Sequence, residues 1–184
     1  GLFKERGLSV TGLNNYLECP WRYFYTNLLR IPKAKTIHQM YGIAVHGALK
    51  DLLREAKPSK KFLVERFNVY LEKEPLIPRD RKTCKEKGEK SLAGWYDSYV
   101  PAKGTVMTEF SIRGILLTPD IRLTGTIDKL ELGADGAAKV TDYKTSKPKT
   151  RGDIEGTTKT SEGNIKRQLV FYKLLLDKYE NGKK

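Results

Sequence analysis

The chain has 184 residues and a mass of 21.0 kDa, enough for one domain with a substantial apolar core and no need of a disulfide or metal staple. Its 35 lysines and arginines against 22 acidic residues give a formal charge of +13. This charge favours a polyanionic partner, nucleic acid first and an anionic membrane second. The alternative is a basic domain without such a partner.

The two cysteines and the hydropathy pattern indicate a reducing compartment and no membrane span. Cys19 and Cys84 show no C-x-x-C spacing, so neither a disulfide framework nor a zinc site is indicated, and a reducing interior is favoured. The N-terminus lacks an apolar signal core, and no apolar run approaches the ~18 residues that a membrane span needs. We therefore expect a cytoplasmic protein that does not enter a membrane.

Residues 1–100 show mainly helical patterns. We expect a helix over 12–18, capped by Thr11 and ended by Pro20, and then a second helix that carries Trp21, Phe24, Tyr25 and Leu28. A third helix is predicted over 40–55, with an inward face and with His46 on another face. The inward face consists of Val45, Ala48, Leu49, Leu52 and Leu53.

Residues 57–90 form a basic insert with eleven basic and six acidic residues. Aromatic and leucine side chains recur in it at helical spacing, which predicts a basic helical subdomain. Pro75 and Pro78 are expected to break this subdomain, and a further helix is predicted over 84–99.

After Pro101 the apolar period changes from helical to two-fold. This change predicts strands over 106–112, 121–132 and 137–144, with a tight turn at Asp135 and Gly136. Residues 145–163 are polar and without periodicity, and a closing helix is predicted over 164–179, ended by residues 181–184. We therefore expect an α/β chain with an antiparallel three-stranded meander and a helical N-terminal region, forming one domain over residues 1–184.

A pair of carboxylates and a lysine stand out in the meander. Asp142 and Lys144 are two residues apart, so in a strand their side chains share a face, and Asp128 ends the motif Gly-Thr-Ile-Asp one strand earlier. Two carboxylates and a lysine on facing strands predict a metal-dependent phosphodiesterase site. The alternative for Asp142 and Lys144 is a surface ion pair worth ~0 to 1 kcal/mol.

The turn between the two strands decides whether the carboxylates meet. A two-residue loop would pair Asp128 with Tyr143 and face it away from Asp142. A three-residue loop with Gly136 in the left-handed conformation pairs Asp128 directly with Asp142. We therefore predict an odd-length loop or a bulge.

Hard oxygen ligands such as these suit Mg²⁺ or Mn²⁺, and the carbonyl of Tyr143 is a candidate third oxygen ligand. Lys144 could orient the attacking water or neutralise the phosphate. An isolated histidine is usually a surface or satisfied core residue, but the helix and the glycine one turn earlier favour His46 as a metal ligand. Glu109 could be an outer ligand, although a strand glutamate more often faces solvent.

The closing helix offers two further polar residues. Gln168 and Tyr172 are four residues apart, hence on one helix face, where they could contact a phosphate or a metal-bound water. The alternative is that Tyr172 packs in the core and Gln168 is solvated.

Five motifs in the chain resemble, in the same order, those of the RecB-like branch of the PD-(D/E)xK nucleases, which occur in helicase-nuclease polypeptides and in CRISPR-associated exonucleases. They are Leu8–Tyr16 together with Cys19–Phe24, then Tyr41–His46, Gly125–Asp128, Asp142–Ser146 and Gln168–Tyr172. The resemblance implies a restriction-endonuclease-like three-layer core that cleaves DNA, often as an exonuclease on ends or single strands.

The resemblance also implies residue roles and partners. His46, Asp128 and Asp142 would bind the catalytic metal, Lys144 would be the catalytic lysine, and Gln168 and Tyr172 would form the Q-x-x-x-Y helix. A helicase in the same polypeptide or complex is the implied partner, in DNA repair or recombination.

The chain departs from this branch in two ways. Many relatives hold an iron-sulfur cluster on one cysteine of the Cys-Pro corner and three near the C-terminus, but no cysteine follows Cys84, so we expect no cluster and a packed Cys19 thiol. The chain also stops after the Q-x-x-x-Y helix, so we expect the final core strand to be missing from it. The alternatives to a deoxyribonuclease are a catalytically inactive DNA-binding module, a regulatory interaction domain and an RNA-directed nuclease.

Overall fold

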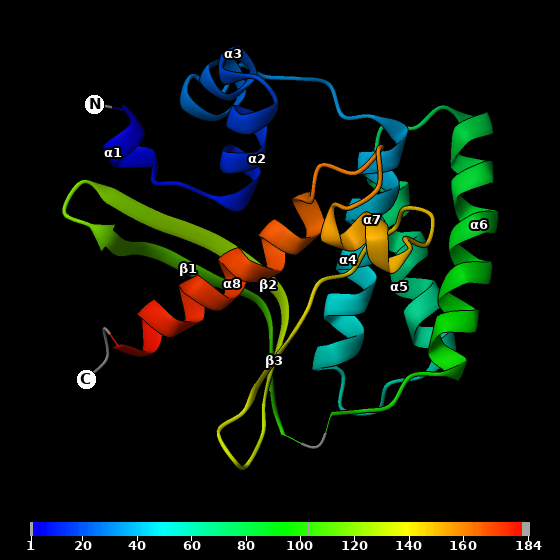
Figure 1. Cartoon of the computed structure of the whole chain (residues 1–184). Helices are drawn as coiled ribbons and strands as arrows, with labels where there is room; N and C mark the ends of the chain where they lie inside the picture. The colour runs from blue at the N-terminus through cyan, green and yellow to red at the C-terminus, as the bar shows by residue number, and fades with distance from the viewer. Residues whose placement is uncertain (1, 103, 182–184) are drawn as a thin grey trace. The chain divides into compact units, whose positions relative to one another are not determined.

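The computed structural model describes residues 2–102 and 104–181, which form two compact units (Figure 1). Unit 1 takes in Gly1–Lys33, Ser111–Thr126 and Lys147–Lys184, and unit 2 takes in Ala34–Phe110 and Ile127–Ser146. The assignment of residues 1–184 to one domain stays a prediction.

Three neighbouring helices build unit 2: α4 (Ile37–Arg54), α5 (Lys60–Glu72) and α6 (Pro78–Asp97) (Figure 1). A capping box of Thr36 and Gln39 begins α4, and the Ser59 side chain accepts the Phe62 amide to begin α5. Their apolar faces form the core of the unit. It is centred on the fully buried Ala44, Ala48, Leu52, Leu63, Phe67 and Leu71.

The helix predicted to start at residue 84 starts at Pro78 instead. A proline is tolerated in the first helical turn, where its missing N–H would have no partner, so Pro78 begins α6 as well as ending the preceding segment. Within α6, Gly88 lies against the Phe67 ring, and a Cβ at this position would come within 2.1 Å of Phe67 Cζ. The helix can therefore pack closely on α5 only at a glycine.

Unit 1 begins with α1 (Leu2–Arg6), α2 (Val10–Glu18), α3 (Pro20–Tyr23) and the π-helical turn η1 (Phe24–Leu28). The cap of α2 is Ser9, whose Oγ accepts the Gly12 amide at 3.1 Å, and not the predicted Thr11. The predicted end before Pro20 is confirmed. The helical spacing of the next aromatics is also found, but their side chains are exposed, with Trp21 67% exposed.

The C-terminal part of unit 1 holds α7 (Arg151–Glu155) and α8 (Asn164–Asn181). A capping box of Thr150 and Asp153 forms α7 inside a segment predicted to lack structure. On α8, Tyr172 and Leu175 are buried, whereas Leu169 is 44% exposed. The predicted helix end at residues 182–184 lies outside the described residues.

The strands β1 (Thr105–Thr118), β2 (Ile121–Leu132) and β3 (Ala138–Thr141) form a sheet in the order β1-β2-β3. The predicted bounds of β2 are confirmed, β1 is longer than predicted, and β3 ends at Thr141, before Asp142. In unit 1, α8 approaches β2 at Gly125, where a Cβ would lie 2.6 Å from a Leu175 methyl. The α/β class with an antiparallel meander is confirmed.

The β2–β3 hairpin has the predicted odd-length loop. Lys129 pairs with Thr141 and Leu132 with Ala138, and the Gly133 amide donates to the Ala137 carbonyl at 2.9 Å, which leaves residues 134–136 as a three-residue loop. Gly136 is left-handed, with φ +79. Lys129 and Thr141 are the last pair of this register, and Asp128 and Asp142 are the next residues beyond it on the two sides of the hairpin; their direct pairing stays a prediction.

Two glycine-to-alanine changes in unit 2 separate backbone strain from packing. At Gly136 and at Gly94 of α6, nothing lies within 4 Å of an added Cβ, but only Gly136 has a positive φ. Gly136→Ala is expected to lower the free energy of unfolding by about 1 kcal/mol, and Gly94→Ala to raise it by roughly as much. Urea unfolding of both variants measures this, and equal shifts would contradict the loop conformation.

Among the described residues, no helix combines the length and the apolar character needed to cross a membrane.

Candidate active site

Asp128 is the centre of a polar cluster in unit 2. It lies in β2 with a largely buried side chain, and its Oδ2 accepts the backbone amide of Tyr143 at 2.9 Å. His46 of α4 approaches the same oxygen, with 3.5 Å between Nδ1 and Oδ2. The predicted candidates His46 and Asp128 are thus brought together, and the hairpin backbone fixes the orientation of the carboxylate.

Glu109 of β1 joins this cluster. One ligand atom each from His46, Glu109 and Asp128 lies within 4.8 Å of the other two. Glu109 has a positive φ of 51, uncommon for a residue with a side chain, and the Arg54 guanidinium binds the neighbouring Thr108 through Nε at 2.7 Å. Glu109 is exposed, as a strand glutamate usually is. It nevertheless lies beside His46 and Asp128, where it can act as a metal ligand.

Asp142 and Lys144 form an ion pair just beyond β3, with 2.6 Å between Nζ and Oδ2. The Asp142 side chain is nearly buried and that of Lys144 is half exposed. The prediction that both residues lie in a strand was wrong. The Tyr143 amide binds Asp128 Oδ2 rather than a neighbouring strand, so the strand ladder ends at Thr141.

The Tyr143 ring packs between other aromatic side chains and holds the backbone that carries Asp142 and Lys144. It packs edge-on against Trp95 of α6, with 6.2 Å between ring centroids, and against the His46 ring at 6.3 Å. Burial raises the pKa of Tyr143 to about 12, with further contributions from Tyr99, Glu131 and Asp128. The phenol is therefore neutral near pH 7, which leaves the backbone carbonyl as the group that could bind a metal.

The charges of Asp128 and His46 support each other. Burial pushes the pKa of Asp128 upward, but hydrogen bonds from His46 and the Tyr143 amide, together with the charges of His46 and Lys144, bring it below its usual value. The pKa of His46 is raised, mainly by its hydrogen bond to Asp128 and against the effect of burial. Asp128 is therefore favoured as a negative carboxylate, which is the form that binds a metal ion.

Gln168 and Tyr172 lie on one face of α8 in unit 1, as predicted. Gln168 Nε2 donates to Tyr172 Oη at 2.7 Å, and both residues line a pocket of that unit. Tyr172 is only 4% exposed, so its ring is part of the core, as the alternative interpretation predicted. Gln168 is half-buried and not fully solvated. Their contact orients the amide and the phenol toward each other.

A model of the PD-(D/E)XK nuclease superfamily matches residues 7–184. The chain belongs to the PD-(D/E)XK nuclease superfamily. This membership implies nuclease activity with DNA as substrate, and nucleases of this superfamily generally use divalent metal ions. The restriction-endonuclease-like fold class predicted from the motifs agrees with the match. No curated protein shows a significant match to the chain.

The donor set of this nuclease fits a divalent ion. Mg²⁺ and Mn²⁺ prefer oxygen ligands, with imidazole better tolerated by Mn²⁺, and two ligands at right angles on one such ion are roughly 3 Å apart. The 3.5 Å between His46 Nδ1 and Asp128 Oδ2 is close to that separation. Small side-chain rotations would therefore suffice for both groups to bind one ion.

The sequence favoured a solvent-facing Glu109 over an outer metal ligand, because the positive φ that places Glu109 beside His46 and Asp128 has no sequence signal. Glu109→Gln is expected to weaken Mn²⁺ binding about tenfold, since it removes one negative charge next to His46 and Asp128. Isothermal titration with Mn²⁺ measures this. The matched control is Glu65→Gln on the exposed face of α5, and equal affinities for both variants would exclude Glu109 from the site.

Proposed function

We propose that the chain is a Mg²⁺- or Mn²⁺-dependent deoxyribonuclease of the RecB-like branch. It acts as an exonuclease on DNA ends or single strands, and it works as a module with a helicase in DNA repair or recombination. The observation that supports the proposal is that Asp128 and Asp142 both directly follow the last register pair of the hairpin, Lys129 and Thr141, with His46 beside Asp128 and Lys144 paired with Asp142.

In this proposal His46, Asp128, Asp142 and the Tyr143 carbonyl hold the catalytic ion. The ion supplies a water of lowered pKa and neutralises charge on the scissile phosphate. The carboxylates supply the hard oxygen ligands that such an ion prefers. The His46 imidazole, half-buried beside Asp128, favours activity with Mn²⁺ at least equal to that with Mg²⁺.

Lys144 acts on the substrate rather than on the ion. Its Nζ lies 2.6 Å from Asp142 Oδ2, and its half-exposed side chain can reach a phosphate oxygen or the attacking water. A fixed ammonium group there stabilises the negative charge that develops in the transition state. Tyr143 also positions Asp128, because its amide donates to the Asp128 carboxylate while its half-buried ring packs against Trp95 and His46.

Gln168 and Tyr172 are proposed to bind a phosphate of the DNA. Their mutual hydrogen bond and their place in a polar pocket support this role. The formal charge of +13 supports a nucleic-acid substrate as well. A cytoplasmic location, one domain over residues 1–184 and the lack of an iron-sulfur cluster belong to the same proposal; Cys19 and Cys84 are both free thiols.

Incubation of the protein with end-labelled single- and double-stranded DNA tests the function. The proposal predicts cleavage that requires Mn²⁺ or Mg²⁺, stops in EDTA and releases mononucleotides or short products from an end. Asp142→Ala is expected to be inactive, and Lys144→Ala is expected to cleave about 100- to 1000-fold more slowly than the wild type. Metal-dependent cleavage that is unchanged in both variants would refute the site.

The second candidate is a DNA-binding module of the same fold without activity. The positive charge would support it, but binding alone does not require the juxtaposition of His46, Asp128, Asp142 and Lys144. DNA binding without cleavage in the same assay would favour this candidate, and cleavage of RNA in place of DNA would favour an RNA-directed nuclease.

A further inference from the structure

We propose that four arginines of unit 1 form a binding site for the phosphates of a DNA single strand. They line one pocket of about 890 Å³ and are Arg6, Arg30, Arg113 and Arg122. The inference rests on the proposed function, because the strand it names is the substrate of the nuclease. It concerns binding and does not involve the metal ligands.

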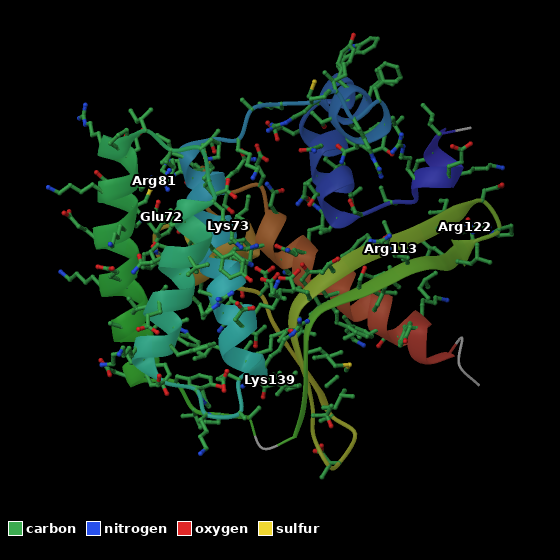
Figure 2. All side chains as sticks on the ribbon, turned by 180° about the vertical axis from the view of Figure 1, so that it is seen from behind. Glu72, Lys73, Arg81, Arg113, Arg122 and Lys139 are labelled. Atoms are coloured by element: carbon green, nitrogen blue, oxygen red, sulfur yellow. The ribbon has the colours of Figure 1, made fainter. Side chains whose placement is uncertain are left out.

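The pocket is built from segments far apart in the sequence. Leu8 forms a parallel bridge with Leu123 of β2, with hydrogen bonds of 2.7 Å from the Leu8 amide to the Arg122 carbonyl and 2.9 Å from the Thr124 amide to the Leu8 carbonyl. The chain from Arg6 to Ser9 thus lies along β2. Arg113 and Arg122 come from the two strands of the β1–β2 hairpin (Figure 2).

The positive charge of the pocket is not neutralised within unit 1. Among the described residues, none of the four arginines makes an ion pair, and Glu5 is the one acidic residue among those that line the pocket. Arg113 Nε donates only to a neutral hydroxyl, Ser111 Oγ, at 3.3 Å. Four guanidinium groups against one carboxylate predict an anionic ligand with several charges.

The remaining lining groups are suited to phosphate oxygens. They include short hydroxyl side chains, which donate hydrogen bonds without adding charge, and the amide and phenol of α8. They are Ser9, Thr11, Ser111, Thr124, Thr126, Gln168 and Tyr172. Planar guanidinium groups bind phosphate in a bidentate manner, and hydroxyl groups of this kind are common contacts to the DNA backbone.

Arg30 occupies a position where glycine would be the less strained residue. It follows η1 with a φ of 56, and the Ile31 amide closes the turn by donating to the Tyr25 carbonyl at 3.0 Å. A left-handed residue after a helix is usually glycine, because a Cβ strains this conformation. The chain thus has a strained arginine that lines the pocket, and strain of this kind is typical of binding sites.

A single strand fits these features better than a free phosphate or a duplex. Four arginines from different segments match several phosphates in succession, whereas one phosphate would occupy only one or two guanidinium groups. The pocket is concave and of the size of a small-ligand site, so it can take in a flexible strand but not a rigid double helix.

Fluorescence anisotropy with a labelled oligothymidylate in EDTA tests the site without any cleavage. Arg113→Gln and Arg122→Gln are each expected to weaken binding about tenfold at low salt. The slope of log K against log salt should fall by about 0.7 for each arginine removed. The matched control is Arg79→Gln on the exposed start of α6 in unit 2, which is expected to bind like the wild type.

Arg30→Gly separates binding from folding. Because glycine relieves the strain at this position, the variant is expected to melt about 2–4 °C higher than the wild type while it binds the strand about tenfold more weakly. A variant that melts higher and binds as tightly as the wild type would remove Arg30 from the site.

Other outcomes would overturn the proposal directly. Equal affinities and salt slopes for the wild type, Arg113→Gln and Arg122→Gln would do so, as would an equal loss in Arg79→Gln, which would indicate binding by net charge alone. Tighter binding of a duplex, or competition by inorganic pyrophosphate as effective as by the oligonucleotide, would refute a single-strand site. Binding without cleavage would refute the nuclease activity and leave this site standing.

Discussion

Asp128→Asn is expected to lower metal-dependent DNA cleavage by at least about 1000-fold, because it removes the negative charge at the centre of the cluster. Asn keeps the size of the side chain and an oxygen that can accept the Tyr143 amide, now 2.9 Å from Asp128 Oδ2. The fold should therefore persist while the metal is lost. The measurements are the single-turnover rate on end-labelled DNA, the Mn²⁺ affinity and the melting temperature.

The matched control for this change is Asp120→Asn. Asp120 lies between β1 and β2, is exposed and pairs with Lys4, so the variant loses the same charge away from the cluster. Its rate and Mn²⁺ affinity are expected to equal those of the wild type. A rate for Asp128→Asn within about threefold of this control would contradict the assignment of Asp128.

Lys144→Ala is expected to lower the cleavage rate about 100- to 1000-fold while Mn²⁺ still binds. The side chain carries no metal-binding group in its protonated form, but its ammonium group is held at 2.6 Å from Asp142. Its loss should therefore appear in kcat and leave the affinity for DNA in EDTA little changed. Single-turnover kinetics and Mn²⁺ titration separate the two quantities.

Lys139→Ala is the control for this variant. Lys139 is an exposed lysine on β3 of the same hairpin (Figure 2), so its removal changes the net charge equally. This variant should cleave like the wild type. If Lys144→Ala and Lys139→Ala lowered the rate by the same factor, the effect would be general electrostatic attraction of DNA, and Lys144 would have no specific role.

The hairpin was predictable because its geometry follows from counting residues. Side chains alternate along strands, so the fourteen positions from Asp128 to Asp142 and the left-handed Gly136 are enough to fix the register. The core of unit 2 was predictable for a similar reason, since the apolar residues of α4 recur at helical spacing and are buried. Both features depend on local periodicity.

Features that depend on distant partners were not predictable. Glu109 adopts a positive φ near Arg54 and His46, and neither neighbour can be inferred from its own segment. The strand containing Asp142 ends early because the Tyr143 amide binds a carboxylate fifteen residues away. In each case a tertiary contact replaces the conformation that local propensity favours.

The choice of helix cap shows a limit of local patterns. The sequence predicted Thr11 as the cap of α2, but Ser9 also carries a hydroxyl near the start of this helix. Ser9 is the cap in the structure, and its segment also pairs with β2 through Leu8, which extends the backbone there. The sheet contact therefore decided the start of the helix.

The anomalous difference map of a crystal of the protein grown with Mn²⁺ tests the central claim most directly. The predicted result is a strong peak in unit 2, about 2.1 Å from carboxylate oxygens of Asp128 and Asp142, with His46 and the Tyr143 carbonyl as further ligands. A fully occupied Mn²⁺ ion elsewhere in the protein, with none at Asp128, would contradict the account.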